Sequence, residues 1–137
     1  MEVEIILIDD DEISLLITKK ILMVNAFLVK HSTITSFSEP REAVDYINTL
    51  QFQEGRGYVI LLDINMPKIN GWDFLDLVHD NVHNEKVSFI MLSSSISEQD
   101  KEQAKENPLV KEFLNKPLDF KKCKVVEGIV AGSLPAN

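Results

Sequence analysis

Two short apolar runs that end in acidic residues constrain the fold of this chain most. Residues 58–62 (YVILL) lead directly into Asp63, and residues 5–8 (IILI) lead into Asp9, Asp10 and Asp11. An unbroken apolar run of this length is typical of a strand buried on both faces of a parallel sheet. The carboxyl ends of parallel strands share one edge, where open α/β sheets place their sites. The sequence therefore predicts that both acidic groups lie at the same edge.

The rest of the chain alternates between strand-like and helix-like segments with short connections. Strands are predicted over residues 3–8, 29–37, 58–62, 87–92 and 110–114. Helices are predicted over residues 11–25, 38–50, 72–79, 97–107 and 119–130. This alternation favours right-handed crossovers and helices on both faces of the sheet. The predicted fold class is α/β, a doubly wound, five-stranded parallel sheet. Strand order 2-1-3-4-5, the flavodoxin-like one of the two common doubly wound orders, would place the first, third, fourth and fifth strands side by side.

Apolar side chains recur every three or four residues in the predicted helices, and such a stripe is expected to cover the sheet. In the first and last helices the stripe comprises Ile13, Leu16, Ile17, Ile21 and Leu22, and then Phe120, Cys123, Val126 and Ile129 or Val130. Ser38 is expected to cap the second helix, with Pro40 in its first turn.

Composition narrows the class of protein. The 22 acidic and 14 basic residues give a net charge of -8, which argues against direct binding to nucleic acid or to an anionic membrane. A single cysteine rules out an internal disulfide, and neither a leader nor a membrane-length apolar stretch is visible. We therefore expect a cytoplasmic protein with one domain over residues 1–137, a core over about 2–130 and a tail over 131–137.

Four sets of polar residues follow four of the predicted strands. They are the acidic group after residue 8, Asp63 after the third strand, Ser93 after the fourth and Lys116 beyond the fifth. Clustered carboxylates repel each other unless a cation neutralises them, and hard oxygen ligands favour Mg²⁺. A hydroxyl and an ammonium group can hold phosphoryl oxygens. The constellation predicts Mg²⁺-dependent phosphoryl transfer onto an aspartate.

Four stretches together resemble the receiver domain of two-component response regulators. They are residues 7–11 (LIDDD), 61–71 (LLDINMPKING), 90–94 (IMLSS) and 113–117 (FLNKP). The resemblance spans nearly the whole chain in the order found in that family. It implies a stand-alone receiver that is not an enzyme acting on other molecules, because it catalyses only its own phosphorylation and dephosphorylation.

The resemblance assigns the metal ligands and the phosphoacceptor. Asp63 is the implied phosphoacceptor and Asp10 a direct Mg²⁺ ligand, while Asp9 acts through water. Asn65 contributes its backbone carbonyl to the metal, and its side chain and that of Ser95 are expected to tune hydrolysis of the acyl phosphate. Asp11 is left to cap the first helix.

The resemblance also assigns the groups that respond to the phosphoryl group. Ser93 takes the position of the switch hydroxyl, and Phe113 that of the aromatic residue whose rotamer follows it. Lys116 is the implied phosphate-binding lysine, and its bond to Pro117 is a candidate cis peptide.

The implied partners are proteins. A histidine kinase or a histidine phosphotransfer protein donates the phosphoryl group, and water later removes it slowly. Phosphorylation changes a face made by the fourth predicted helix, the fifth strand and the fifth helix, which binds a downstream protein or a second copy of the chain. On that face lie Glu98, Lys101, Lys105, Lys111 and Lys122.

Two rival functions remain open at the level of sequence. A Mg²⁺-dependent aspartyl phosphatase resembles a receiver, but usually has a second acid where this chain has Asn65, and it needs a cap domain. A receiver that serves only as an interaction module is the other rival. His79 and His83 have a spacing that can chelate a metal, yet a solvated helix end explains them better.

Overall fold

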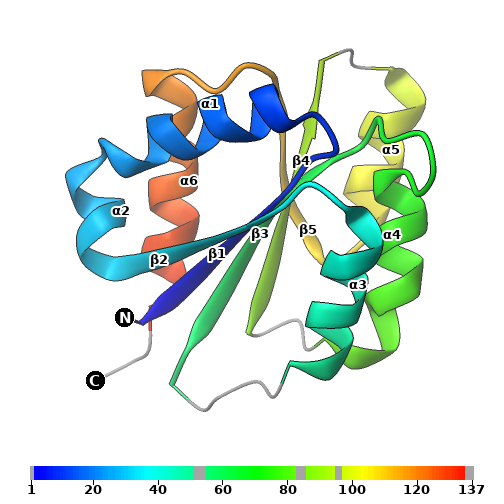
Figure 1. The fold of residues 1–137 in the computed structure, drawn as a ribbon, viewed down its shortest axis with the longest axis horizontal. Helices are drawn as coiled ribbons and strands as arrows, with labels where there is room; N and C mark the ends of the chain where they lie inside the picture. Colours follow the sequence, from blue (N-terminus) through cyan, green and yellow to red (C-terminus); the bar gives the residue numbers. More distant parts are fainter. Residues whose placement is uncertain (1, 51–54, 83–85, 95–96, 135–137) are drawn as a thin grey trace.

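The computed structural model describes residues 2–50, 55–82, 86–94 and 97–134, which form a parallel five-stranded sheet flanked by helices (Figure 1). The strands are β1 (Val3–Ile8), β2 (Ser32–Phe37), β3 (Gly57–Asp63), β4 (Val87–Ser93) and β5 (Val110–Asn115). The helices are α1 (Glu12–Met23), α2 (Ala26–His31), α3 (Pro40–Thr49), α4 (Gly71–Val78), α5 (Glu98–Glu106) and α6 (Phe120–Gly132), with a 3-10 turn over His79–Asn81. The strand order is β2-β1-β3-β4-β5, which confirms the predicted doubly wound, flavodoxin-like fold.

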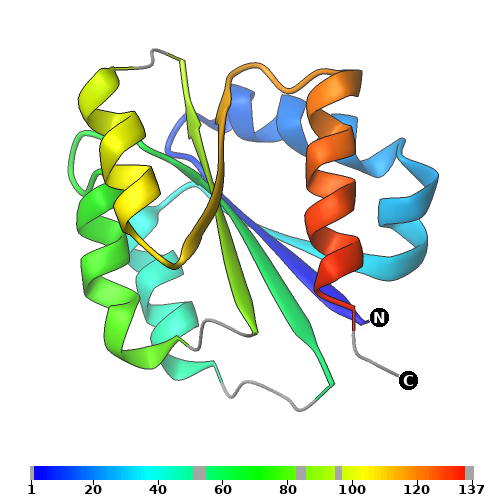
Figure 2. The same ribbon diagram turned by 180° about the vertical axis from the view of Figure 1, so that it is seen from behind.

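The helices form one layer on each face of the sheet. Helices α1, α2 and α6 cover one face, and α3, α4 and α5 cover the other (Figures 1 and 2). Successive side chains of a strand point to opposite faces, so Ile5 of β1 packs with the first layer and Ile6 with the second. None of the helices in the described part of the chain is both long and apolar enough to cross a membrane.

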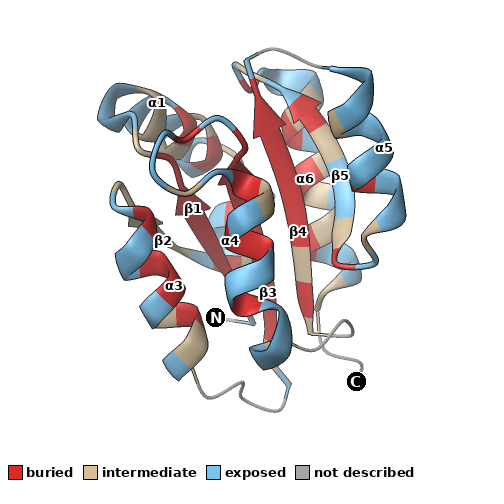
Figure 3. Ribbon diagram, turned by 90° about the vertical axis from the view of Figure 1, so that its right-hand side faces the viewer, coloured by how far each residue is buried: buried red, intermediate tan, exposed pale blue. Residues whose placement is uncertain are grey.

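Burial follows the position of each strand in the sheet. Every residue of β1 and of β3 is buried, as the unbroken apolar runs predicted. The edge strand β5 is largely exposed or half-buried, which Figure 3 shows as a mostly blue and tan ribbon beside the red β4. The acidic residues therefore lie at the ends of two strands, β1 and β3, that are buried along their whole length.

The segment between the first two strands differs from the prediction. Residues 29–31 belong to the additional helix α2 rather than to the second strand, and α1 ends at Met23 rather than at residue 25. The side chain of Asn25 caps α2 by accepting a hydrogen bond from Leu28 N at 3.0 Å. This cap starts a new helical turn, and the run of three β-branched residues that favours a strand follows Ser32.

The predicted apolar stripe of α1 is wrong in part. Ile13, Leu16 and Ile17 are 72%, 52% and 47% exposed, whereas Leu22 is buried. On α6, Phe120 is 79% exposed, although Cys123 and Val126 are buried as expected. Apolar residues surround much of α1, so their spacing indicates a helix without selecting the half that meets the sheet.

Two helix boundaries also need correction. Ser38 is not the cap of α3, because Glu39 occupies that position without a side-chain hydrogen bond and Pro40 is the first helical residue. Proline supplies the backbone angle required in a first turn, so the helix can start without a capping side chain. At the other end of the chain, α6 continues through Gly128 to Gly132, two residues beyond its predicted end.

Candidate functional site

Three acidic side chains meet where β1 and β3 end. Asp9 and Asp10 follow β1, and Asp63 is the last residue of β3. One carboxylate oxygen from each lies within 4.8 Å of the others. Asp9 and Asp63 are buried, whereas Asp10 keeps part of its surface in solvent. The two apolar runs therefore predicted correctly that these acidic groups lie close together.

Asp11, the third acidic residue after β1, has a structural role at the start of α1. Asp11 accepts hydrogen bonds from Ile13 N and Ser14 N and so caps the helix. Asp11 N in turn donates to Asp9 Oδ1 at 3.0 Å, which fixes the Asp9 carboxylate. The predicted role of Asp11 as a helix cap is therefore confirmed.

Lys116 pairs with the acidic cluster from the end of β5. Its ammonium Nζ lies 2.6 Å from Asp9 Oδ2 and 3.4 Å from Asp63 Oδ1. Lys116 N donates to the carbonyl of Ser93 at 2.8 Å, and the Lys116–Pro117 peptide is cis. Lys116 therefore contacts two of the three carboxylates of the cluster.

Ser93 and Asn65 add polar groups from the end of β4 and from the loop after β3. Ser93 ends β4 and is fully buried, and its hydroxyl accepts a hydrogen bond of 3.0 Å from Asn65 Nδ2. Asn65 N also donates to Asp63 Oδ1 at 3.2 Å. The bond between the Asn65 amide and the Ser93 hydroxyl was not predicted, because no local pattern indicates a contact across 28 residues. Ser95 lies outside the described residues.

The environment of Asp63 raises the pKa of its carboxyl group. Burial is the largest cause, and the neighbouring charge of Asp9 adds to it, while Lys116 and the Asn65 N–H act in the opposite direction. Three carboxylates and one ammonium leave an excess of negative charge. Hard oxygen donors with such an excess of negative charge suit a hard divalent cation. The side chains of the cluster therefore fit a metal ion.

The loop after Asp63 is held against the end of β3 by Gly71. Gly71 N donates to the carbonyl of Ile64 at 2.9 Å. A Cβ atom at Gly71 would lie 2.9 Å from Ile64 Cα and 3.1 Å from the Asp63 carbonyl oxygen. Only a residue without a side chain allows α4 to start this close to Asp63.

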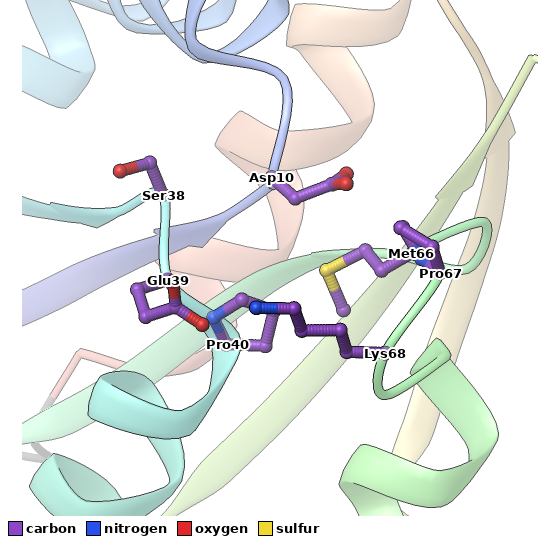
Figure 4. Close-up of a pocket in the computed structure, with 7 residues that line it drawn as sticks. All are labelled: Asp10, Ser38, Glu39, Pro40, Met66, Pro67 and Lys68. Atoms are coloured by element: carbon purple, nitrogen blue, oxygen red, sulfur yellow. The ribbon is translucent and has the colours of Figure 1, made fainter.

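A hollow of about 200 Å³ opens beside Asp10, between the loops that precede α3 and α4. Its walls include Glu39, Met66 and Lys68. In Figure 4 the Asp10 carboxylate points towards the loop that carries Met66 and away from the Ser38 hydroxyl. Solvent therefore reaches the acidic cluster from this side.

The remaining predicted residues lie away from the acidic cluster. Phe113 of β5 is half-buried and borders a groove of about 270 Å³ between α5 and β5. His79 is exposed and pairs with Asp80 at 3.2 Å. His83 lies outside the described residues, so the possible histidine pair is not seen.

Comparison with known proteins identifies the family. The response regulator receiver domain family matches residues 5–126. The fold is similar to that of a response regulator receiver protein from Dyadobacter fermentans, with 24% identity, a TM-score of 0.81 and coverage of 98% of this chain and 99% of that chain. A two-component response regulator from Cytophaga hutchinsonii gives 27% identity, a TM-score of 0.80 and coverage of 94% and 96%.

A third similar structure is the bacteriophytochrome response regulator AtBRR, at 28% identity and a TM-score of 0.67, with coverage of 98% of this chain and 95% of that chain. This chain therefore belongs to the family of response regulator receiver domains of two-component systems. The resemblance seen in the four sequence motifs is confirmed at the level of the family.

Proposed function

We propose that this receiver domain accepts a phosphoryl group on Asp63 from a phosphohistidine and that the change alters a protein-binding face. The observation that carries the proposal is the buried Asp63 carboxylate beside Asp9, Asp10 and the ammonium of Lys116. A carboxylate oxygen of Asp63 attacks phosphorus, the P–N bond breaks, and the imidazole nitrogen leaves with the electron pair. The product is an acyl phosphate on this chain, so its chemistry is confined to its own aspartate.

Mg²⁺ is the proposed cofactor, held by Asp10 directly, by Asp9 through water, and by Asp63 and the backbone carbonyl of Asn65. When bound, it supplies positive charge that neutralises the carboxylates and the transferring oxygens. The hard oxygen donors and the excess negative charge of the cluster support this choice. Water later attacks phosphorus, and the Asp63 carboxylate leaves.

Lys116 and Ser93 are the proposed ligands of the phosphoryl oxygens. Lys116 Nζ already lies 3.4 Å from Asp63 Oδ1, so a short movement brings it to an oxygen of the new group. The Ser93 hydroxyl, at the end of the neighbouring strand β4, donates to another. Ser93 is fully buried, and its hydroxyl accepts a hydrogen bond from Asn65 Nδ2. In the proposed switch Ser93 moves towards that oxygen, and Phe113 follows.

The phosphodonor is proposed to be a histidine kinase or a histidine phosphotransfer protein, which docks beside the acidic cluster. Ile13 and Ile17 line a hollow of about 200 Å³ that they share with Lys116 and Pro117. Both isoleucines are exposed, as is Phe120 three residues beyond Pro117. Exposed apolar side chains around a reactive centre support docking of an apolar protein surface.

The output face is proposed to comprise α5, β5 and α6. Because α2 is an additional helix, α5 and α6 correspond to the fourth and fifth helices predicted from the sequence. The groove between α5 and β5 is lined by Lys101, Lys105 and Lys111. Glu98 is also exposed, and Lys122 is half-buried. A downstream protein or a second copy binds this face in the cytoplasm after phosphorylation.

The test is phosphorylation by acetyl phosphate or phosphoramidate in the presence of Mg²⁺, followed by intact mass spectrometry. The wild type is expected to gain one phosphoryl group, about 80 Da, only when Mg²⁺ is present. Asp63→Asn is expected to gain nothing, and Asp76→Asn, which changes an exposed carboxylate on α4, is expected to behave as the wild type. A wild type without an adduct that also fails to bind beryllofluoride would favour a phosphorylation-independent interaction module.

A further inference from the structure

Helix α5 buries little apolar surface against the rest of the protein. Its sequence, EQDKEQAKE, is polar, and Ala104 is the one buried side chain among its nine residues, all of which are described. The groove of about 270 Å³ between α5 and β5 shows that the helix does not pack tightly against the neighbouring strand. A helix with so little apolar burial depends on individual polar contacts for its position.

One such contact joins α5 to α4. The indole Nε1 of Trp72 donates a hydrogen bond of 2.9 Å to Asp100 Oδ1, and both residues are half-buried. The two helices lie side by side in both ribbon views (Figures 1 and 2). A hydrogen bond to a carboxylate is stronger than one between neutral groups.

The two residues of this hydrogen bond follow two different strands that end at the site. Trp72 comes after β3, and Asp100 comes after β4. Trp72 follows Gly71, whose backbone packs directly against the carbonyl of Asp63 at the end of β3. Asp100 lies in the first turn of α5, which begins five residues after Ser93 at the end of β4. The bond therefore joins the segment that leaves the phosphoacceptor to the segment that leaves the switch hydroxyl.

The anchoring of the two segments is unequal. Helix α4 has a capping box between Asn70 and Asp73, and it buries Phe74, Leu75 and Val78 against the sheet. Helix α5 has its Ser97 cap and Ala104. A displacement of Ser93 relative to Asp63 is therefore expected to move α5 rather than α4, and to lengthen the distance between Trp72 and Asp100.

We propose that the hydrogen bond between Trp72 and Asp100 is a latch that holds α5 in its unphosphorylated position and opens when the phosphoryl group on Asp63 draws Ser93 towards it. This inference rests on the proposed function. The latch sets the balance between two positions of α5 without touching the reacting atoms. Removing it shifts the balance towards the phosphorylated form, and by linkage strengthens the binding of a phosphoryl analogue at Asp63.

The experiment measures Mg²⁺–beryllofluoride binding by calorimetry, together with fluorescence of Trp72, which is the only tryptophan of the chain. Asp100→Ala is expected to bind beryllofluoride about three- to tenfold more tightly than the wild type, the range for loss of one partly exposed hydrogen bond to a carboxylate. Its emission without ligand should resemble that of the wild-type complex. Asp100→Asn keeps an acceptor oxygen and is expected to lie between the two.

Glu102→Ala is the matched control, since it removes one negative charge from an exposed position of the same helix. It should bind as the wild type does, and circular dichroism should show that each variant is folded. The latch is refuted if Asp100→Ala binds as Glu102→Ala does, if it binds more weakly than the wild type, or if saturating beryllofluoride leaves the Trp72 emission of the wild type unchanged. A wild type that binds no beryllofluoride refutes the proposed function as well.

Discussion

At the scale of single residues, Asp63 combines burial with a charge that its surroundings do not fully neutralise. The raised pKa means that the folded protein binds a proton at this carboxyl more tightly than the unfolded chain does. Stability from this group is therefore present below the ordinary pKa of 3.8 and is lost as the pH rises through the raised value. At neutral pH the ionised carboxylate destabilises the fold.

The isosteric change Asp63→Asn removes this unfavourable charge. We expect the free energy of unfolding at neutral pH and without Mg²⁺ to rise by roughly 1–3 kcal/mol, the scale for relief of a buried charge. Urea denaturation measures this difference, which should shrink as the pH falls towards 3.8 because the wild-type carboxyl becomes protonated. A variant less stable than the wild type at neutral pH would contradict this account.

Lys116 has the opposite effect on stability, because it contacts the buried Asp9 and Asp63 carboxylates. Lys116→Met is expected to lower the free energy of unfolding by about 3 kcal/mol in the presence of a chelator, since it leaves buried charges unpaired. Saturating Mg²⁺ should restore part of that loss. Lys111→Met is the control, because Lys111 is exposed and its ammonium donates a hydrogen bond to the Pro108 carbonyl, away from the acidic cluster.

At the scale of elements, two glycines illustrate opposite constraints on helices. A Cβ atom at Gly71 would press on the backbone of Ile64 and Asp63, whereas one at Gly128 in α6 would meet nothing within 4 Å. Gly71→Ala should therefore lower the free energy of unfolding by about 1–3 kcal/mol through crowding. Gly128→Ala should raise it by about 0.5–1 kcal/mol, because alanine loses less backbone freedom in a helix.

Thermal unfolding of the two alanine variants checks this pair directly. The expected result is a lower Tm for Gly71→Ala and a higher Tm for Gly128→Ala than for the wild type. Equal shifts in the same direction would show that the close packing of α4 on the end of β3 does not govern the stability of that helix.

At the scale of the whole molecule, the exposed apolar residues of α1 are expected to affect phosphoryl transfer from a protein donor but not from a small-molecule donor. Ile17 lines the hollow that includes Lys116 and Pro117, next to the acidic cluster but not in it. Ile17→Ser is expected to lower kcat/KM for transfer from a phosphorylated histidine protein about tenfold, the effect of losing an interface anchor. The rate with acetyl phosphate should stay unchanged, since that donor needs no docking surface.

Val24→Ser provides the matched control for this experiment. Val24 is also exposed and apolar, but it lies at the far end of α1, about 10 Å along the helix from Ile17. If both serine variants slow the protein donor equally, or if neither does, the donor does not dock on the surface around Ile17.

The apolar patterns and the resemblance carried by the four motifs together predicted the fold class, the strand order and the convergence of five residues near one edge of the sheet. These residues are Asp9, Asp10, Asp63, Ser93 and Lys116. Apolar runs identify buried parallel strands, and the acids stand directly after them, so topology alone brings them together. The family match over residues 5–126 agrees with this prediction. The roles of the individual residues stay predictions until the phosphorylation experiment is made.

Three features depended on packing instead: which side of α1 is buried, the presence of α2, and which polar side chains pair around the site. Local patterns do not record these features, since Asn65 and Ser93, or Trp72 and Asp100, are each separated by 28 residues. Their contacts depend on the register of β3 against β4 and on the angle at which each helix leaves its strand. The sequence patterns therefore predict where the acidic residues meet, whereas packing decides which side chains contact one another around them.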